Sequence, residues 1–186
     1  RPPTVAAAPS QTPRRTPLFD RHVAASARLV PFAGWEMPVQ YSGLMEEHRA
    51  VRRSAGLFDV SHMGEVSVRG PGAEAFLNRL TPNDVAKLAP GRAHYSGLLN
   101  DDGGYLDDLL IYRLAADDFF VVVNAANAAN DFDWKRRHAE TADGVEVEDA
   151  GQLGTIARGA GGEIQLTDAI ADMLEFAVPQ VREVIT

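Results

Sequence analysis

The chain has 186 residues, of which 45% are hydrophobic, and this suits one domain, or one domain with tails, that buries a real core. Its 26 acidic and 18 basic residues leave a net charge of −8, which argues against a nucleic-acid partner, because such partners are bound by clustered basic charge. There is no cysteine, so disulfides, thiolate metal sites and cysteine nucleophiles are excluded, and no apolar run approaches the ~20 residues of a membrane span.

The first 15 residues differ in composition from the rest of the chain. They hold four prolines and three arginines and no acidic residue, so we expect a disordered arm. Transit peptides are also rich in arginine and poor in acids, but they are amphipathic, whereas prolines interrupt this segment. A species-specific extension is therefore favoured over a transit peptide.

The next segment predicts two helices separated by an aromatic loop. A short helix is expected at Asp20–Arg28, and residues 29–43 form a loop rich in proline, glycine and aromatic residues. Its aromatic side chains either anchor the loop on the core or form the wall of a pocket for a flat ligand. The second helix, Leu44–Ala55, has Ser42 as its expected cap and Gly56 as its stop.

Alternating strands and helices follow. We expect strands at 57–60 and 65–69, then a helix that begins near Pro71. The predicted buried stripe of that helix is Ala73, Phe76, Leu77 and Leu80. Beyond residue 124 we expect a helix at 128–139, a strand at 144–148, a glycine-rich segment at 151–163, and a small helix capped by Thr167.

Between these parts, residues 95–124 predict a β-meander whose middle strand carries two adjacent carboxylates. The expected strands are Tyr95–Leu99, Tyr105–Leu114 and Phe119–Asn124. Because successive strand residues point to opposite faces, Asp107 and Asp108 cannot both face solvent if one face is buried. A carboxylate on an inward face is costly unless it is paired, hydrogen-bonded or functional, so this pair is the first candidate for chemistry.

Six segments in order resemble the aminomethyltransferase family of the glycine cleavage system, the T-protein family. They read TPLFDRH, FAGWEMPVQY, EEHRAVRRSAGLFDVSHMGEVSVRGP, NDVAKL, YSGLLNDDGGYLDDLLIY and VVVNAANAANDFDW. The resemblance runs from about Thr16 to Val147 and implies an α+β fold, an antiparallel sheet flanked by helices, as an incomplete folate-binding aminomethyltransferase fold. Folate-dependent demethylating oxidases contain a similar domain, so the resemblance leaves the folate domain of a dimethylglycine- or sarcosine-type oxidase as the alternative, alongside a non-catalytic folate-binding protein.

The resemblance also implies a reaction and its partners. Family members take an aminomethyl group from the lipoyl arm of the H-protein, release ammonia and pass the one-carbon unit to tetrahydrofolate. The implied partners are therefore lipoylated H-protein and tetrahydrofolate, with no metal, nucleic acid or membrane. The implied compartment is the bacterial cytoplasm, with the mitochondrial matrix as the alternative.

The family's functional residues correspond to five positions of this chain. The second aspartate of the pair, Asp108, is the implied catalytic residue, which positions the pterin and makes its nitrogen a better nucleophile. Met63 and Leu110 would pack on the pterin and benzoyl rings, Tyr95 would contact folate, and Asn124 would present both a donor and an acceptor. Taken singly, Met63 also fits a core filler, Tyr95 a strand aromatic and Asn124 a turn residue. Asp107 is expected to be the solvated partner of Asp108.

Two departures from the family limit what this chain is expected to do. Family members are roughly twice as long, and the segment GAGGEIQLTDAI resembles a part of bacterial UTP–glucose-1-phosphate uridylyltransferases instead. The expected organisation is thus a disordered arm at 1–15, a truncated folate-binding domain at 16–149, and an unrelated glycine-rich segment with a short helix at 150–186. We expect a folate site that binds weakly and turns over poorly or not at all, because a shared binding site loses part of its wall.

Overall fold

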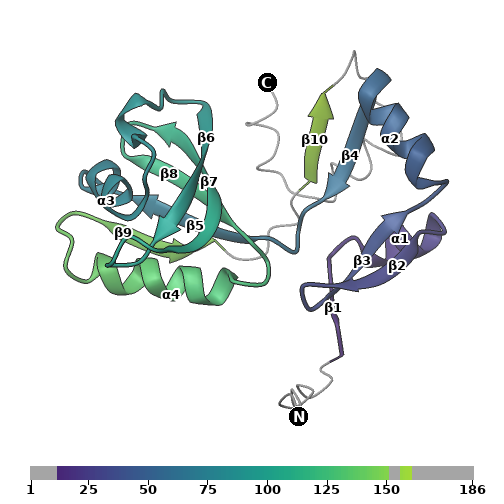
Figure 1. The fold of residues 1–186 in the computed structure, drawn as a ribbon, viewed down its shortest axis with the longest axis horizontal. Coiled ribbons are helices and arrows are strands. Elements are labelled where there is room, and N and C mark those ends of the chain that lie inside the picture. The colour runs from purple at the N-terminus through teal and green to yellow at the C-terminus, as the bar shows by residue number, and fades with distance from the viewer. Residues whose placement is uncertain (1–11, 151–155, 161–186) are drawn as a thin grey trace, which may run out of the picture. The chain divides into compact units, whose positions relative to one another are not determined.

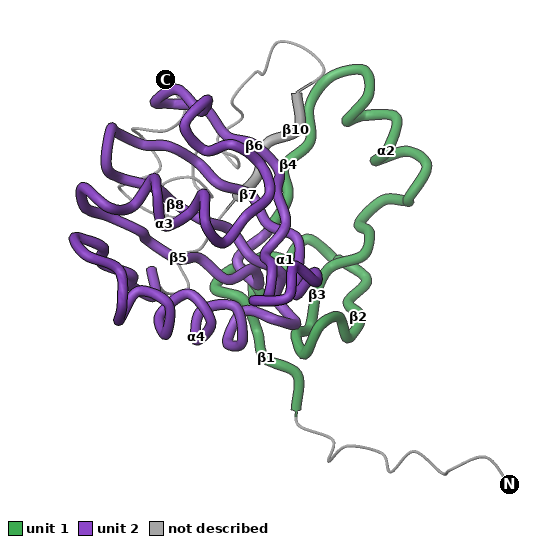
Figure 2. Tube along the Cα trace, turned by 60° about the vertical axis from the view of Figure 1, so that its left-hand side comes forward, with its two compact units in different colours: residues 1–59, 156–186 green, residues 60–155 purple. Residues whose placement is uncertain are grey.

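The computed structural model describes residues 12–150 and the backbone of 156–160. Two compact units are distinguished, residues 1–59 with 156–186 and residues 60–155, coloured green and purple in Figure 2. The expected helix after Thr167 and the first 11 residues of the expected arm lie outside the described residues.

Within its described residues, the first unit holds two small sheets and two helices, which are labelled in Figure 1. Its elements are β1 (Arg14–Arg15), α1 (Phe19–Ala24), β2 (Arg28–Phe32), β3 (Trp35–Gln40), α2 (Leu44–Arg53), β4 (Ala55–Asp59) and β10 (Ile156–Ala160). One sheet has the order β1-β3-β2, and in the other β10 pairs antiparallel with β4. β10 thus lies within the segment that the sequence analysis assigned to the tail.

The prediction of a loop at residues 29–43 is wrong, because β2 and β3 form an antiparallel hairpin there. Ala33 and Gly34 make the turn at positive φ, and the burial of Trp35 and Met37 alternates with partly exposed neighbours along β3. The proline and glycine content of this segment suggested a loop. Burial of the Trp35 and Met37 side chains stabilises a hairpin instead.

The arm is also shorter than expected, because Arg14 and Arg15 pair in parallel with β3. The guanidinium of Arg14 lies 4.1 Å from the ring centre of Trp35, and Arg15 Nε lies 3.2 Å from a carboxylate oxygen of Glu36. A cation over an aromatic face and an exposed ion pair are each weak contacts, but together they hold the two residues on the sheet.

The start of α2 is capped by a residue inside the helix rather than by Ser42. Glu47 Oε1 accepts backbone N–H bonds of 2.7, 2.8 and 2.9 Å from Tyr41, Ser42 and Gly43. A carboxylate in the first turn also interacts favourably with the helix dipole. One side chain therefore satisfies three donors of the incoming chain, and these bonds lower the pKa of Glu47.

The second unit is a five-stranded sheet of order β6-β7-β8-β5-β9, whose described pairings are all antiparallel. Its elements are β5 (Gly64–Arg69), α3 (Ala73–Leu80), the 3-10 turn η1 (Val85–Lys87), β6 (Arg92–Leu99), β7 (Tyr105–Ala115), β8 (Asp118–Val123), α4 (Ala128–Ala139) and β9 (Glu146–Asp149). Figure 1 shows α3 and α4 flanking this sheet. The predicted α+β class with an antiparallel sheet flanked by helices is confirmed.

One face of this sheet forms the core with both helices. Its members include Val66, Val68, Leu98, Leu109, Ile111, Phe119, Val121 and Val123 from the strands and Ala73, Phe76, Leu77 and Leu80 from α3. The predicted buried stripe of α3 is therefore confirmed, as are the three strands of the meander and the helix at 128–139. The opposite face of the sheet is the one on which the candidate site lies.

Candidate functional site

The five predicted site residues come together on one face of the second unit's sheet. Tyr95 pairs with Leu110, and Leu110 pairs with Val122, so these three side chains form one row across β6, β7 and β8. Because side chains alternate along a strand, this row faces away from the buried Leu109 and Ile111.

The second row lies one pleat along the same face. Gly97 pairs with Asp108, and continuing the register beyond Leu109–Val123 places Asn124 next to Asp108. Gly64 pairs with Val123, so Met63 lies at the level of Asn124. Asp108, Asn124 and Met63 are each half-buried, which leaves part of each side chain available to a ligand.

Asn124 joins the two carboxylates of the aspartate pair. Its Nδ2 lies 2.9 Å from Asp108 Oδ1 and 2.9 Å from Asp107 Oδ1. Both amide hydrogens are therefore donated to carboxylates, and the amide oxygen is the group left to a ligand. The sequence led us to expect that Asn124 offers a ligand both a donor and an acceptor. In the structure it offers only the acceptor, its amide oxygen.

The prediction that Asp107 is the solvated member of the pair is wrong. Asp107 shares the core-facing side of β7 with Leu109, and its Oδ2 is buried. Burial by itself would raise the pKa of Asp107, but hydrogen bonds from the Asn124 side chain, the Asp108 backbone, Asn127 and Asp131 outweigh it and hold the pKa below its ordinary value. Asp107 is thus an ionised, hydrogen-bonded carboxylate behind the site.

Two further residues of this face were missed by the sequence analysis. A Cβ atom at Gly97 would lie 2.2 Å from the ring of Tyr105, so that ring rests directly on the glycine opposite Asp108. Tyr105 and Tyr95 are exposed by 68% and 60% of their surface. A tyrosine two residues before an aspartate pair is a weak signal, and only the strand pairing reveals that its ring lies on Gly97, the residue opposite Asp108.

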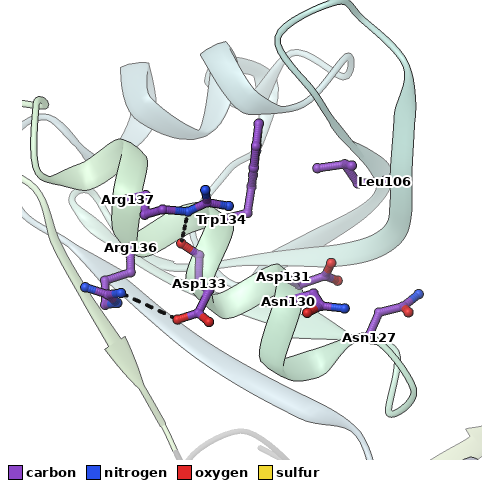
Figure 3. A pocket seen from close by; sticks show the side chains of 8 residues that line it. All are labelled: Leu106, Asn127, Asn130, Asp131, Asp133, Trp134, Arg136 and Arg137. Carbon is purple, nitrogen blue, oxygen red and sulfur yellow. Dashed lines mark hydrogen bonds and ion pairs between the residues drawn. The ribbon is translucent and has the colours of Figure 1, made fainter.

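A separate pocket of about 510 Å³ lies along α4 (Figure 3). Its lining side chains are Leu106, Asn127, Asn130, Asp131, Asp133, Trp134, Arg136 and Arg137. Figure 3 shows that Arg136 pairs with the Asp133 carboxylate and that Arg137 donates to the Asp133 backbone carbonyl at one end of the pocket. Asp131 and the two asparagines lie at the other end. None of the five predicted site residues lines this pocket, so it is a feature distinct from the two rows.

In the first unit a hydrogen-bonded array joins α1, β4 and the connection between β3 and α2. His22 of α1 lies with Nε2 2.8 Å from Asp59 Oδ2 at the end of β4, and its Nδ1 lies 2.8 Å from the hydroxyl of Tyr41. His22 and the Asp59 side chain are buried. Partial burial, followed by the charges of Asp59 and Glu47, raises the pKa of Tyr41, which keeps its hydroxyl protonated.

Among the described residues, no group of three or more His, Cys, Asp or Glu side chains is arranged to hold a metal ion. None of the helices in residues 12–150 is long and apolar enough to cross a membrane.

Comparison with known proteins gives consistent matches over most of the chain. The family model described as "GCVT N-terminal domain" matches residues 18–157. The aminomethyltransferase of Deinococcus deserti is 58% identical over 129 residues, which cover 67% of this chain and 36% of that protein. The aminomethyltransferase of Chloroherpeton thalassium is 48% identical over 165 residues, or 87% of this chain and 46% of that protein.

A solved structure matches in the same way. The crystal structure of glycine cleavage system aminomethyltransferase T from Bartonella henselae superposes with a TM-score of 0.67 and 43% identity. The match covers 72% of this chain and 37% of that one. The chain therefore spans less than half the length of the relatives that it matches.

Proposed function

Because the chain belongs to the family of GCVT N-terminal domains, we propose that it carries the pterin-binding part of an aminomethyltransferase site. In that reaction the one-carbon unit of an aminomethylated lipoyl H-protein passes to tetrahydrofolate, and ammonia is released. The observation that carries the proposal is the row of Asp108, Asn124 and Met63 beside the row of Tyr95 and Leu110, on one accessible sheet face.

The chemistry of these rows fits a reduced pterin. The edge of a pterin presents N–H donors, and this face offers the Asp108 carboxylate and the Asn124 amide oxygen as acceptors. Tyr95, Leu110 and Met63 supply an aromatic ring, an aliphatic chain and a thioether for the flat faces of a ligand. Tetrahydrofolate supplies the nitrogen nucleophiles that accept the one-carbon unit.

The role proposed for Asp108 is to orient the pterin and to stabilise positive charge near it. Asn124 holds Asp108 Oδ1 at 2.9 Å, so the carboxylate is fixed before a ligand arrives. A fixed carboxylate costs no reorganisation when charge develops next to it, and this is the principal advantage of a preorganised site. Asp107, ionised behind it, adds a second negative charge on the far side of Asn124.

The test is calorimetric titration of the full chain with tetrahydrofolate under reducing conditions. We expect saturable one-to-one binding that Asp108→Asn weakens, while Asp102→Asn, in the exposed turn before β7, leaves it unchanged. Absence of saturable heat from a sample that circular dichroism shows to be folded would overturn the proposal for this chain.

Turnover separates an enzyme from a folate-binding protein without catalysis. With aminomethylated lipoyl H-protein as substrate, an enzyme loses ammonia release in Asp108→Asn beyond what its weaker binding explains. Equal rates at saturating tetrahydrofolate in the parent and in Asp108→Asn would remove Asp108 from the chemistry.

A further inference from the structure

A cluster of buried charged groups lies directly behind the candidate site. Asp131 and Lys135, one turn apart on α4, are exposed by only 3% and 0% of their surface. Both lie close enough to Asp107 for their charges to interact with it. Burying charges is costly unless they are paired or used, so the cluster calls for an explanation beyond packing.

With both carboxyl groups ionised, two oxygens of this cluster have no hydrogen-bond donor among the described residues. They are Asp107 Oδ2 and Asp131 Oδ2, and both are shielded from solvent. A proton on Asp131 that is donated to Asp107 gives both oxygens a partner.

The electrostatics of Asp131 support that proton. Burial is the largest cause that raises the pKa of Asp131, to about 7, and the charge of Lys135 opposes it. The hydrogen bond to Asp107 and the charges of Asp107 and Asp108 raise it further. Asp131 is therefore mostly protonated below neutral pH, while Asp107, whose pKa is lowered, stays ionised.

The contacts continue from this pair to the candidate site. Asp107 presents its other oxygen, Oδ1, to Asn124 Nδ2 at 2.9 Å, and the same nitrogen lies 2.9 Å from Asp108 Oδ1. Asp131 thus reaches Asp108 through two intervening side chains, Asp107 and the Nδ2 group of Asn124.

We propose that Asp131 is a positioning residue of the candidate site, which fixes Asp107 so that Asp107 and Asp108 together lock the amide of Asn124. Without its partner on α4, Asp107 loses one of the hydrogen bonds that orient it, and its bond to the Asn124 amide is less well fixed. The oxygen that Asn124 presents to a ligand then loses its fixed direction. This inference rests on the proposed function for the identity of the ligand, but not for the geometry.

The first experiment follows the side-chain amide resonances of Asn124 by NMR between pH 5.5 and 9. In the parent chain we expect them to titrate with a midpoint about 7, where Asp131 loses its proton, and Asp131→Asn should abolish that step. Lys135, whose pKa burial lowers to about 8, gives a later step, which Asp131→Asn keeps but moves to lower pH because the charge of Asp131 no longer raises that pKa. The matched control, Asp133→Asn, changes an exposed aspartate of the same helix and should titrate like the parent. An unchanged step near pH 7 in Asp131→Asn would overturn the inference.

The second experiment measures tetrahydrofolate affinity at pH 6. Asp131→Leu removes the donor to a charged partner, and we expect roughly tenfold weaker binding, the scale of one such hydrogen bond. Asp131→Asn keeps an N–H donor and should stay within about threefold of the parent. A folded Asp131→Leu chain that binds as well as the parent would refute the positioning role.

The two measurements separate this inference from the proposed function. If the parent chain binds no tetrahydrofolate, the proposed function fails, and the Asn124 resonances still decide whether Asp131 acts on that amide. If the parent binds tetrahydrofolate but its Asn124 resonances do not titrate near pH 7, the inference fails and the proposed function survives.

Discussion

Asn124 Nδ2 lies 2.9 Å from Asp108 Oδ1 at the end of β8, and it lies equally close to Asp107 Oδ1. One neutral amide therefore separates two carboxylates that are adjacent in sequence and on opposite faces of β7. Without a donor between them the two negative charges would repel each other, and each would lose a hydrogen bond that favours its ionised form.

Replacing Asn124 by alanine should affect both stability and binding. Two carboxylates lose their shared donor, so we expect the free energy of unfolding to fall by about 1–3 kcal/mol in urea denaturation. The pKa of Asp107 should rise, because the Asn124 hydrogen bond helps to lower it. Tetrahydrofolate affinity should fall roughly tenfold or more in calorimetry. Asn130→Ala, at an exposed asparagine of α4, is the matched control and should leave all three quantities unchanged.

Much of the fold was predictable because local pattern and burial agree in the second unit. The meander strands show alternation or apolar runs, and the stripe of Phe76, Leu77 and Leu80 has helical spacing, so the same residues that give the signal fill the core. In the first unit, the prolines and glycines around Trp35 gave a loop signal, whereas burial of Trp35 and Met37 made a hairpin. Tertiary packing overrode local preference there.

The sequence predicted residues that lie together on the sheet, but not which of the two adjacent carboxylates is buried. The conflict between strand pattern and charge identified Asp107 and Asp108 from the sequence, yet which one is buried depends on the register of β7. A helix residue such as Asp131 gives no sequence signal for contact with Asp107, since that contact depends on how α4 packs on the sheet. The ring of Tyr105 over Gly97 likewise follows only from strand pairing.

The array of Tyr41, His22 and Asp59 should contribute strongly to the stability of the first unit. His22→Leu leaves the buried carboxylate of Asp59 with one donor fewer, and we expect a loss of about 3 kcal/mol in the free energy of unfolding by urea. Tyr41→Phe removes only a hydroxyl from His22 Nδ1 and should cost about 1 kcal/mol. His48→Ala, at an exposed histidine of α2, should stay within about 0.5 kcal/mol of the parent. A loss no larger in His22→Leu than in His48→Ala would show that the array does not stabilise the unit.

Close packing at Gly64 should make even one added methyl group destabilising. A Cβ there would lie 2.5 Å from Ala128 Cβ and 2.7 Å from Val123 Cγ2, so α4 would have to shift away from β5. We expect Gly64→Ala to lower the free energy of unfolding by about 1–3 kcal/mol. Combining it with Ala128→Gly, which alone costs roughly 1 kcal/mol, should recover part of that loss. Strict additivity of the two single changes would contradict the proposed contact.

The raised pKa of Asp131 should give the stability of the chain a specific pH dependence. The ordinary value is 3.8 and the folded value is about 7, so between these limits the folded state keeps a proton that the unfolded state releases. Stability from this group therefore falls as pH rises from 4 to 7 and is level above 7. Titration of Asp107, whose pKa is lowered, changes the stability only below that window, and titration of Lys135, whose pKa is lowered to about 8, changes it only above that window.

Relative to the parent, Asp131→Asn should gain stability steadily between pH 4 and 7 in urea denaturation, whereas Asp133→Asn should not. Parallel stability curves for the parent and Asp131→Asn would mean that Asp131 is already ionised in the folded chain at acidic pH, and that the two buried oxygens are satisfied in some other way.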